Sequence, residues 1–181
     1  KAAQDGDTIT LFDDAELEFT DNPQYNNIYA SGINLNGKTL TIKDYDIRFD
    51  DVTIQNGTIV VAPGQYKGTA TFLMYDKNIT FEAVDIRATG LAGAYLIGLE
   101  GTSNLNLIDS EIIIDNPSLV NLTAAIACNG SGMTTVKNSN VSVKNINGRA
   151  FLNTSCSVEN STVTADYVKA GFYIPNGKSL S

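Results

Sequence analysis

The sequence predicts an all-β solenoid: a right-handed parallel β-helix of about six turns, with three short strands in each turn. Three observations lead to this fold class. A seven-residue pattern recurs along the chain at intervals of roughly 20–30 residues, the spacing of stacked structural repeats. Apolar and polar residues alternate in and beside each copy, which is the period of a half-buried strand. No segment carries a convincing amphipathic helix pattern.

The repeated pattern reads apolar, polar, usually Asp or Asn, small or apolar, polar, apolar. Its downstream copies follow one another after 26, 29 and 22 residues, and they begin at Phe81, Leu107, Val136 and Val158. Upstream copies are expected to begin at Phe12, Ile42 and Phe49. Ile42 and Phe49 are too close for both to hold the same place in successive turns, so the upstream register stays open.

Each copy is predicted to be two strands that meet at a tight corner. Ile112 and Val141 are expected to point inward. Serine recurs at one position of the repeated pattern, which indicates a corner with little room for a side chain: Ser110, Ser139 and Ser161. The residues before the corners suit a left-handed bend, which Asp and Asn tolerate: Asp51, Asp109, Asn138 and Asn160. An antiparallel β-sandwich is the alternative, because alternation alone does not fix strand direction.

The chain is expected to form one domain over residues 1–181, because no shift in composition marks a linker. Residues 176–181 closely repeat residues 36–41, where the earlier copy leads into further strands. We therefore expect the natural protein to continue past Ser181. We also expect an uncapped end of the solenoid at Tyr173, Ile174 and Leu180.

Composition narrows the classes of function. The net charge of −8 and the pI of about 4.4 argue against binding to nucleic acid, whose phosphates require Lys and Arg. No apolar run is long enough to insert into a membrane. The absence of histidine removes Ser-His and Cys-His nucleophiles, and Cys128 and Cys156 are expected to be free, buried thiols.

With these features the chain resembles the pectate-lyase-like right-handed parallel β-helix superfamily, of the bacterial cell-surface module type. The resemblance is carried by the Asn138-Ser139 and Asn160-Ser161 corners and by the openings at residues 5–11 and 35–42. It implies a secreted or cell-surface location. It does not fix an activity, because the superfamily includes lyases, hydrolases, adhesins and spacers.

Charged residues gather between residues 44 and 51. Alternation places Asp44, Asp46, Arg48 and Asp50 on one outward face, and Asp85-x-Arg87 matches Asp46-x-Arg48, so the two motifs are expected to stack as a charge array. Asp44, Asp46 and Asp50 could supply oxygen ligands to calcium, the one cofactor that the sequence suggests. The resemblance implies that Arg48 or Arg87 would be the base of a lyase. The alternative is a solvated ladder of ion pairs, each worth less than about 1 kcal/mol.

Tyrosines are the candidate ligand contacts, because aromatic faces pack on sugar rings. Tyr75, Tyr95 and Tyr173 lie in predicted first strands of their turns. The alternative is that they fill loops or cover the edge of the solenoid.

These observations predict a non-catalytic module of a secreted or cell-surface bacterial protein that adheres to a glycan or another surface ligand. Its other expected partners are further domains of the same protein. A calcium-dependent polysaccharide lyase and a spacer that displays other domains are the alternative hypotheses. A hydrolase is disfavoured because adjacent carboxylates such as Asp13 and Asp14 do not point to the same side of a strand.

Overall fold

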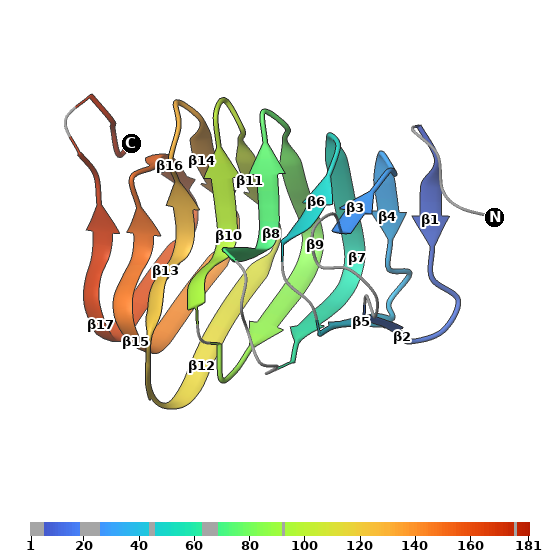
Figure 1. The fold of residues 1–181 in the computed structure, drawn as a ribbon, viewed down its shortest axis with the longest axis horizontal. Helices are drawn as coiled ribbons and strands as arrows, with labels where there is room; N and C mark the ends of the chain where they lie inside the picture. Colours follow the sequence, from blue (N-terminus) through green and yellow to red (C-terminus); the bar gives the residue numbers. More distant parts are fainter. Residues whose placement is uncertain (1–5, 19–25, 44–45, 63–68, 92, 176) are drawn as a thin grey trace.

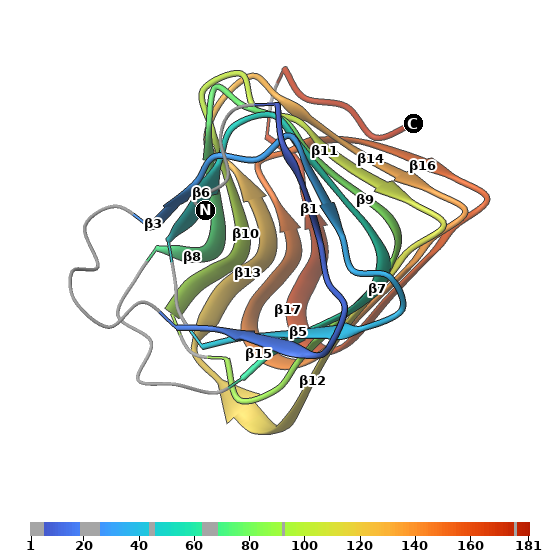
Figure 2. The ribbon, with the colours of Figure 1, turned by 90° about the vertical axis from the view of Figure 1, so that its right-hand side faces the viewer.

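The computed structural model describes residues 6–18, 26–43, 46–62, 69–91, 93–175 and 177–181. These residues form 17 strands and no helix, coiled into a solenoid of about six turns (Figure 1). Seen from the N-terminal end, the chain runs clockwise as it recedes, so the coil is right-handed (Figure 2). No helix suited to crossing a membrane occurs in these ranges.

Each turn passes through three faces in the same order. Face 1 contains β3 (Asn26–Ile28), β6 (Ile47–Phe49), β8 (Ala70–Tyr75), β10 (Gly93–Glu100), β13 (Leu122–Cys128) and the ends of β15 (Asn140–Leu152) and β17 (Thr162–Tyr173). Face 2 contains β1 (Thr8–Thr10), β4 (Gly32–Asn34), β11 (Leu105–Ile108), β14 (Met133–Lys137), β16 (Ser155–Glu159) and the starts of β7 (Val52–Val61) and β9 (Ile79–Ala88). Face 3 contains β2 (Ala15–Leu17), β5 (Thr39–Ile42), β12 (Glu111–Val120), the ends of β7 and β9, and the starts of β15 and β17.

All strand pairings in the described ranges are parallel and join one turn to the next. This arrangement excludes the antiparallel sandwich. It also confirms the predicted all-β parallel solenoid.

The register of the repeat is confirmed downstream and corrected upstream. Leu107 pairs with Phe81 and with Val136, which in turn pairs with Val158. The residue that precedes Phe81 in this column is Ile54. Neither Ile42 nor Phe49 holds that place, because Ile42 lies on face 3 and Phe49 on face 1. Phe12, the third upstream candidate, is 79% exposed.

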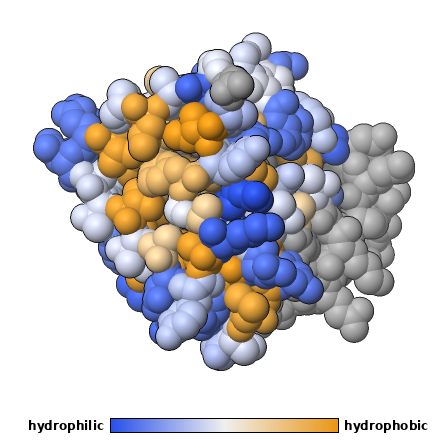
Figure 3. Space-filling model, turned by 90° about the vertical axis from the view of Figure 1, so that its left-hand side faces the viewer, coloured by the Kyte–Doolittle hydropathy of each residue, from blue (hydrophilic) through white to orange (hydrophobic). Residues whose placement is uncertain are grey.

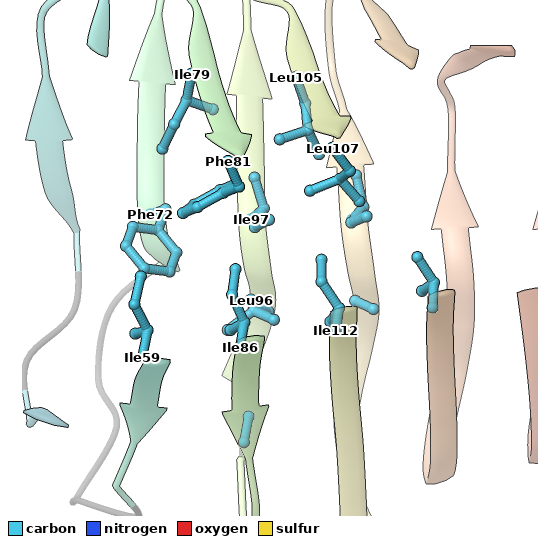
Figure 4. Close-up of a cluster of buried hydrophobic side chains, with 14 of the residues drawn as sticks. Ile59, Phe72, Ile79, Phe81, Ile86, Leu96, Ile97, Leu105, Leu107 and Ile112 are labelled. Atoms are coloured by element: carbon cyan, nitrogen blue, oxygen red, sulfur yellow. The ribbon is translucent and has the colours of Figure 1, made fainter. Parts of the chain in front are cut away.

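The solenoid interior is a continuous stack of aliphatic and aromatic side chains (Figure 4). Ile112 and Val141 are both 0% exposed and stand opposite each other in face 3, so their predicted inward orientation is confirmed. Phe72 packs edge-on against Phe81, with ring centroids 5.5 Å apart, which joins face 1 to face 2 across the interior.

A hydroxyl column stabilises the corner between faces 2 and 3. The backbone N–H of Ser110 donates to Ser139 Oγ over 3.0 Å, and that of Ser139 donates to Ser161 Oγ over 2.9 Å. Val84 N–H donates to Ser110 Oγ in the same way over 3.1 Å. Each hydroxyl thus satisfies an amide of the preceding turn, which fits the predicted tight serine corner.

An amide column runs along the corner between faces 1 and 2. Asn78 N–H and Nδ2 donate to Asp51 Oδ1 over 2.7 and 2.9 Å, and those of Asn104 donate to Asn78 Oδ1 over 3.1 and 2.8 Å. The column ends where Met133 N–H donates to Asn104 Oδ1 over 2.9 Å. These bonds fix how each turn sits on the next.

Left-handed bends occur where the sequence predicts them, with one exception. Asp109, Asn138 and Asn160 have φ of 49°, 49° and 48°. Asp51 does not have this conformation. In that turn of the solenoid Asn56 (φ 62°) is the left-handed residue. The sequence misplaced this corner because Asn56-Gly57, rather than Asp followed by a small residue, turns the chain there.

The last turn leaves its apolar residues open. Tyr173 is 47% and Leu180 53% exposed, and Ile174 is half-buried. Figure 3 looks onto this end and shows apolar side chains at the surface among polar ones. Leu180 bridges to Cys156 on face 2, whereas the similar segment 39–42 lies on face 3, so the two copies occupy different faces. A continuation past Ser181 stays a prediction.

Ala83 gives a stability test of the corner. It is exposed and has φ of 53° in the same corner column as Asp109, a conformation that costs an L-residue roughly 1–2 kcal/mol unless it is Asn, Asp or Gly. Ala83→Asn should therefore raise the free energy of unfolding by about 1 kcal/mol, measured by urea denaturation. Glu82→Asn, one residue earlier in the strand, should give no gain; equal effects of the two changes would contradict this interpretation.

Candidate functional site

An open pocket of about 410 Å³ lies on face 1 near its corner with face 2. Its lining comes from three successive turns: Asn27 of β3, Arg48, Phe49 and Asp50 at β6, and Tyr75 and Lys77 at the end of β8. Three of these residues were predicted site residues from three different hypotheses: Arg48 as a base, Asp50 as a metal ligand and Tyr75 as a sugar contact.

Alternation in β6 explains how Arg48 reaches the pocket. Ile47 is 0% and Phe49 6% exposed, so the side chain between them projects from the opposite side of the strand. The Arg48 guanidinium lies over the Tyr75 ring of the next turn, 4.9 Å from its centroid. Such a cation–π contact holds both side chains in place while Tyr75 remains 49% exposed.

Lys77 and Asp50 form an ion pair beside this stack. Lys77 Nζ lies 3.0 Å from Asp50 Oδ1, and both side chains remain about one-third exposed or more. The pair connects one turn to the next, like the stack. The pocket therefore combines a fixed aromatic ring with carboxylate, ammonium, guanidinium and amide groups that can hydrogen-bond a polar ligand.

The predicted calcium ligands do not gather in the described ranges. Asp46 occupies a left-handed bend (φ 51°), and its Oδ1 accepts from Thr69 N–H over 2.8 Å and Ala70 N–H over 3.1 Å. Asp50 faces Lys77, and Asp44 lies outside the described residues. Within the described ranges no group of three or more Asp, Glu, Cys or His side chains is arranged to hold a metal. Calcium binding stays a prediction.

The prediction that the two Asp-x-Arg motifs stack as a charge array is wrong. Arg48 lies on face 1, whereas Arg87 lies on face 3, where its Nη2 is 3.5 Å from Asp85 Oδ2. Arg87 lines a separate pocket of about 440 Å³ together with Val60, Ile113 and Asp115. The motifs match because polar residues alternate identically on every face, so the pattern does not identify the face.

The three candidate tyrosines share face 1 but not one pocket. Tyr95 is half-buried and packs on a small cluster of Ala124, Ala127 and Leu152. Tyr173 lies under the guanidinium of Arg149, 4.7 Å from the ring centroid, in a second arginine–tyrosine stack. Of the three, Tyr75 is the one that lines the described pocket.

Sequence reasoning missed Asn27, Phe49, Lys77 and Arg149. The sequence interval from Asp50 to Lys77 equals the interval from Arg48 to Tyr75, and each interval is the length of one turn. That coincidence is a usable signal once the register of the turns is known. Because the register of the upstream turns was undecided, this signal could not be recognised from the sequence.

The chain matches no known protein family, no curated protein and no solved structure. The site therefore has to be interpreted from its own geometry.

The cysteines are free and buried, as predicted. Burial raises the pKa of the Cys156 thiol to about 12. The thiol is therefore protonated at neutral pH, which makes it a poor nucleophile and a structural residue of the core.

The Cys156 pKa predicts a loss of stability at alkaline pH. The unfolded chain releases this proton near pH 9.0, whereas the folded protein keeps it up to about pH 12. Between these values the unfolded state binds fewer protons, so the free energy of unfolding should fall by up to about 1.4 kcal/mol per pH unit through this group. Urea denaturation at about pH 8 and about pH 10.5 should show a steeper decline for the wild type than for Cys156→Ala. Parallel declines would contradict the assignment.

Proposed function

We propose that this chain is a non-catalytic binding module of a secreted or cell-surface bacterial protein, and that face 1 contacts a glycan. The observation that carries the proposal is the pocket where Arg48 holds the Tyr75 ring beside the Asp50–Lys77 pair. An aromatic ring with one fixed orientation offers apolar contact to a sugar ring, and the surrounding polar groups suit its hydroxyls. The resemblance to pectate-lyase-like β-helices agrees with a surface module.

The geometry favours binding over the lyase alternative. Arg48 and Arg87, the two candidate bases, lie on different faces, so Arg48 alone could act on a substrate in this pocket. Arg48 is stacked on Tyr75, which suits positioning. The Asp46 carboxylate caps the backbone at Thr69 and Ala70.

Tyr75→Ala tests the proposal. We expect the intact protein to bind glycans on an array, and Tyr75→Ala to weaken the best of them at least tenfold, about 1.4 kcal/mol, because the ring is the central apolar contact. Tyr167→Ala is the matched control, since Tyr167 is 74% exposed and lies outside the pocket.

Two outcomes would replace the proposal. Release of unsaturated products from polygalacturonate or alginate, followed by absorbance, would identify a lyase. Binding to no glycan at all would favour the spacer.

A further inference from the structure

Face 1 carries a second arginine–tyrosine stack that repeats the first. Arg48 of β6 covers Tyr75 of the next strand on face 1, and Arg149 of β15 covers Tyr173 of β17 in the same way, at 4.9 and 4.7 Å. Tyr75 and Tyr173 are almost equally exposed, at 49% and 47%. Face 1 therefore presents two fixed rings, and Tyr173 shares its row with Leu152, Ala127, Gly98 and Leu73, two residues before Tyr75 on β8.

The two stacks are separated along the solenoid axis. From β6 to β15 the order on face 1 is β6, β8, β10, β13, β15, which is four strand spacings. At roughly 4.8 Å per spacing, the stacks lie about 19 Å apart. A single sugar or a disaccharide on Tyr75 does not reach Tyr173.

A row of polar residues, called here the ledge and made of Glu100, Asn129 and Asn153, leads from Tyr75 toward Tyr173. Tyr75 pairs with Glu100, and Glu100 Oε1 accepts from Asn129 Nδ2 over 2.8 Å. Asn129 is exposed and Glu100 is half-buried, so both present polar atoms at the surface. Asn153 follows one turn later, and its N–H donates to the Tyr173 carbonyl over 2.9 Å. A carboxylate and amides in a row suit the hydroxyls of consecutive sugars.

Beside this ledge the strands carry small or apolar outward residues. Gly98 pairs with Leu73 and Ala127, and Ala127 pairs with Leu152, next to Tyr173. A side chain at Gly98 would meet Leu73, Ala70 and Tyr95 at 3.0 to 3.4 Å, so these neighbours pack closely around Gly98 and leave no room for one. Tyr95 is half-buried and packs on Ala127 and Leu152 of this row, so a third aromatic ring lies between Tyr75 and Tyr173 and an oligosaccharide on this path would lie across it.

Charge selects the class of ligand. Along the path Asp50 is already paired with Lys77, Glu100 is a carboxylate, and both guanidiniums lie over rings. The chain as a whole carries a charge of −8, which repels a polyanion. Sugar hydroxyls meet no such repulsion.

We infer that face 1 binds a neutral linear oligosaccharide that lies parallel to the solenoid axis and contacts both Tyr75 and Tyr173. The inference rests on the proposed function and extends it from a single pocket to an elongated surface. Its two contacts act on one chain, so affinity depends on the length of the ligand.

The test uses an array that holds short and long forms of each repeating unit, neutral and acidic. We expect the hits to be neutral glycans long enough to reach both rings, each bound at least tenfold more tightly than its disaccharide. Tyr173→Ala should remove this gain with length and leave the disaccharide affinity unchanged, whereas Tyr75→Ala should weaken both. Affinity for the long form should not change between low and high salt.

Asn129→Ala provides a second variant, since this exposed residue lies on the ledge away from the solenoid end and should reduce the gain with length. Tyr167→Ala is the control. Equal affinity for short and long forms, a Tyr173→Ala variant that keeps the gain, or hits confined to acidic glycans would overturn the inference while the proposed function stands. Binding to no glycan would overturn both.

Discussion

The structure depends on hydrogen bonds that cross from one turn to the next at its corners. A corner interrupts the strand pairing and leaves backbone amides without a ladder partner. Here side-chain oxygens replace the missing partner: Asp51, Asn78 and Asn104 along one corner, and Ser110, Ser139 and Ser161 along another. Each acceptor lies one turn away from its donor. The corners therefore fix the register of the whole coil, in addition to closing it.

The register determines which side chains meet on the outside. Arg48 reaches Tyr75, and Asp50 reaches Lys77, because each partner stands one turn further along face 1. A shift of one residue in the pairing would send every outward side chain inward. The candidate site is therefore a consequence of corner geometry that holds three turns in one alignment, rather than of a local sequence motif.

The sequence was informative where the corners are regular. The copies at Phe81, Leu107, Val136 and Val158 share one corner type, and their stacking and inward residues were predicted correctly. Upstream, Asn56-Gly57 makes the same corner with different residues, so Ile42 and Phe49 were assigned to the wrong column. The same ambiguity placed Arg48 and Arg87 together, although they lie on different faces. Strand alternation has the same period on all three faces, so only the corners distinguish them.

Native-state hydrogen exchange at the corner amides tests the central claim most directly. The amides of Asn104 and Ser139 lie at turns, and that of Met133 lies where β14 begins after a turn; loop amides at turns normally exchange through local openings of almost no free-energy cost. Because each donates to a side chain of an adjoining turn, we predict protection comparable with that of the flanking strand amides, and Asn78→Ala should remove it at Asn104 while Ser139 keeps it. Exchange at unprotected loop rates in the wild type would contradict the account.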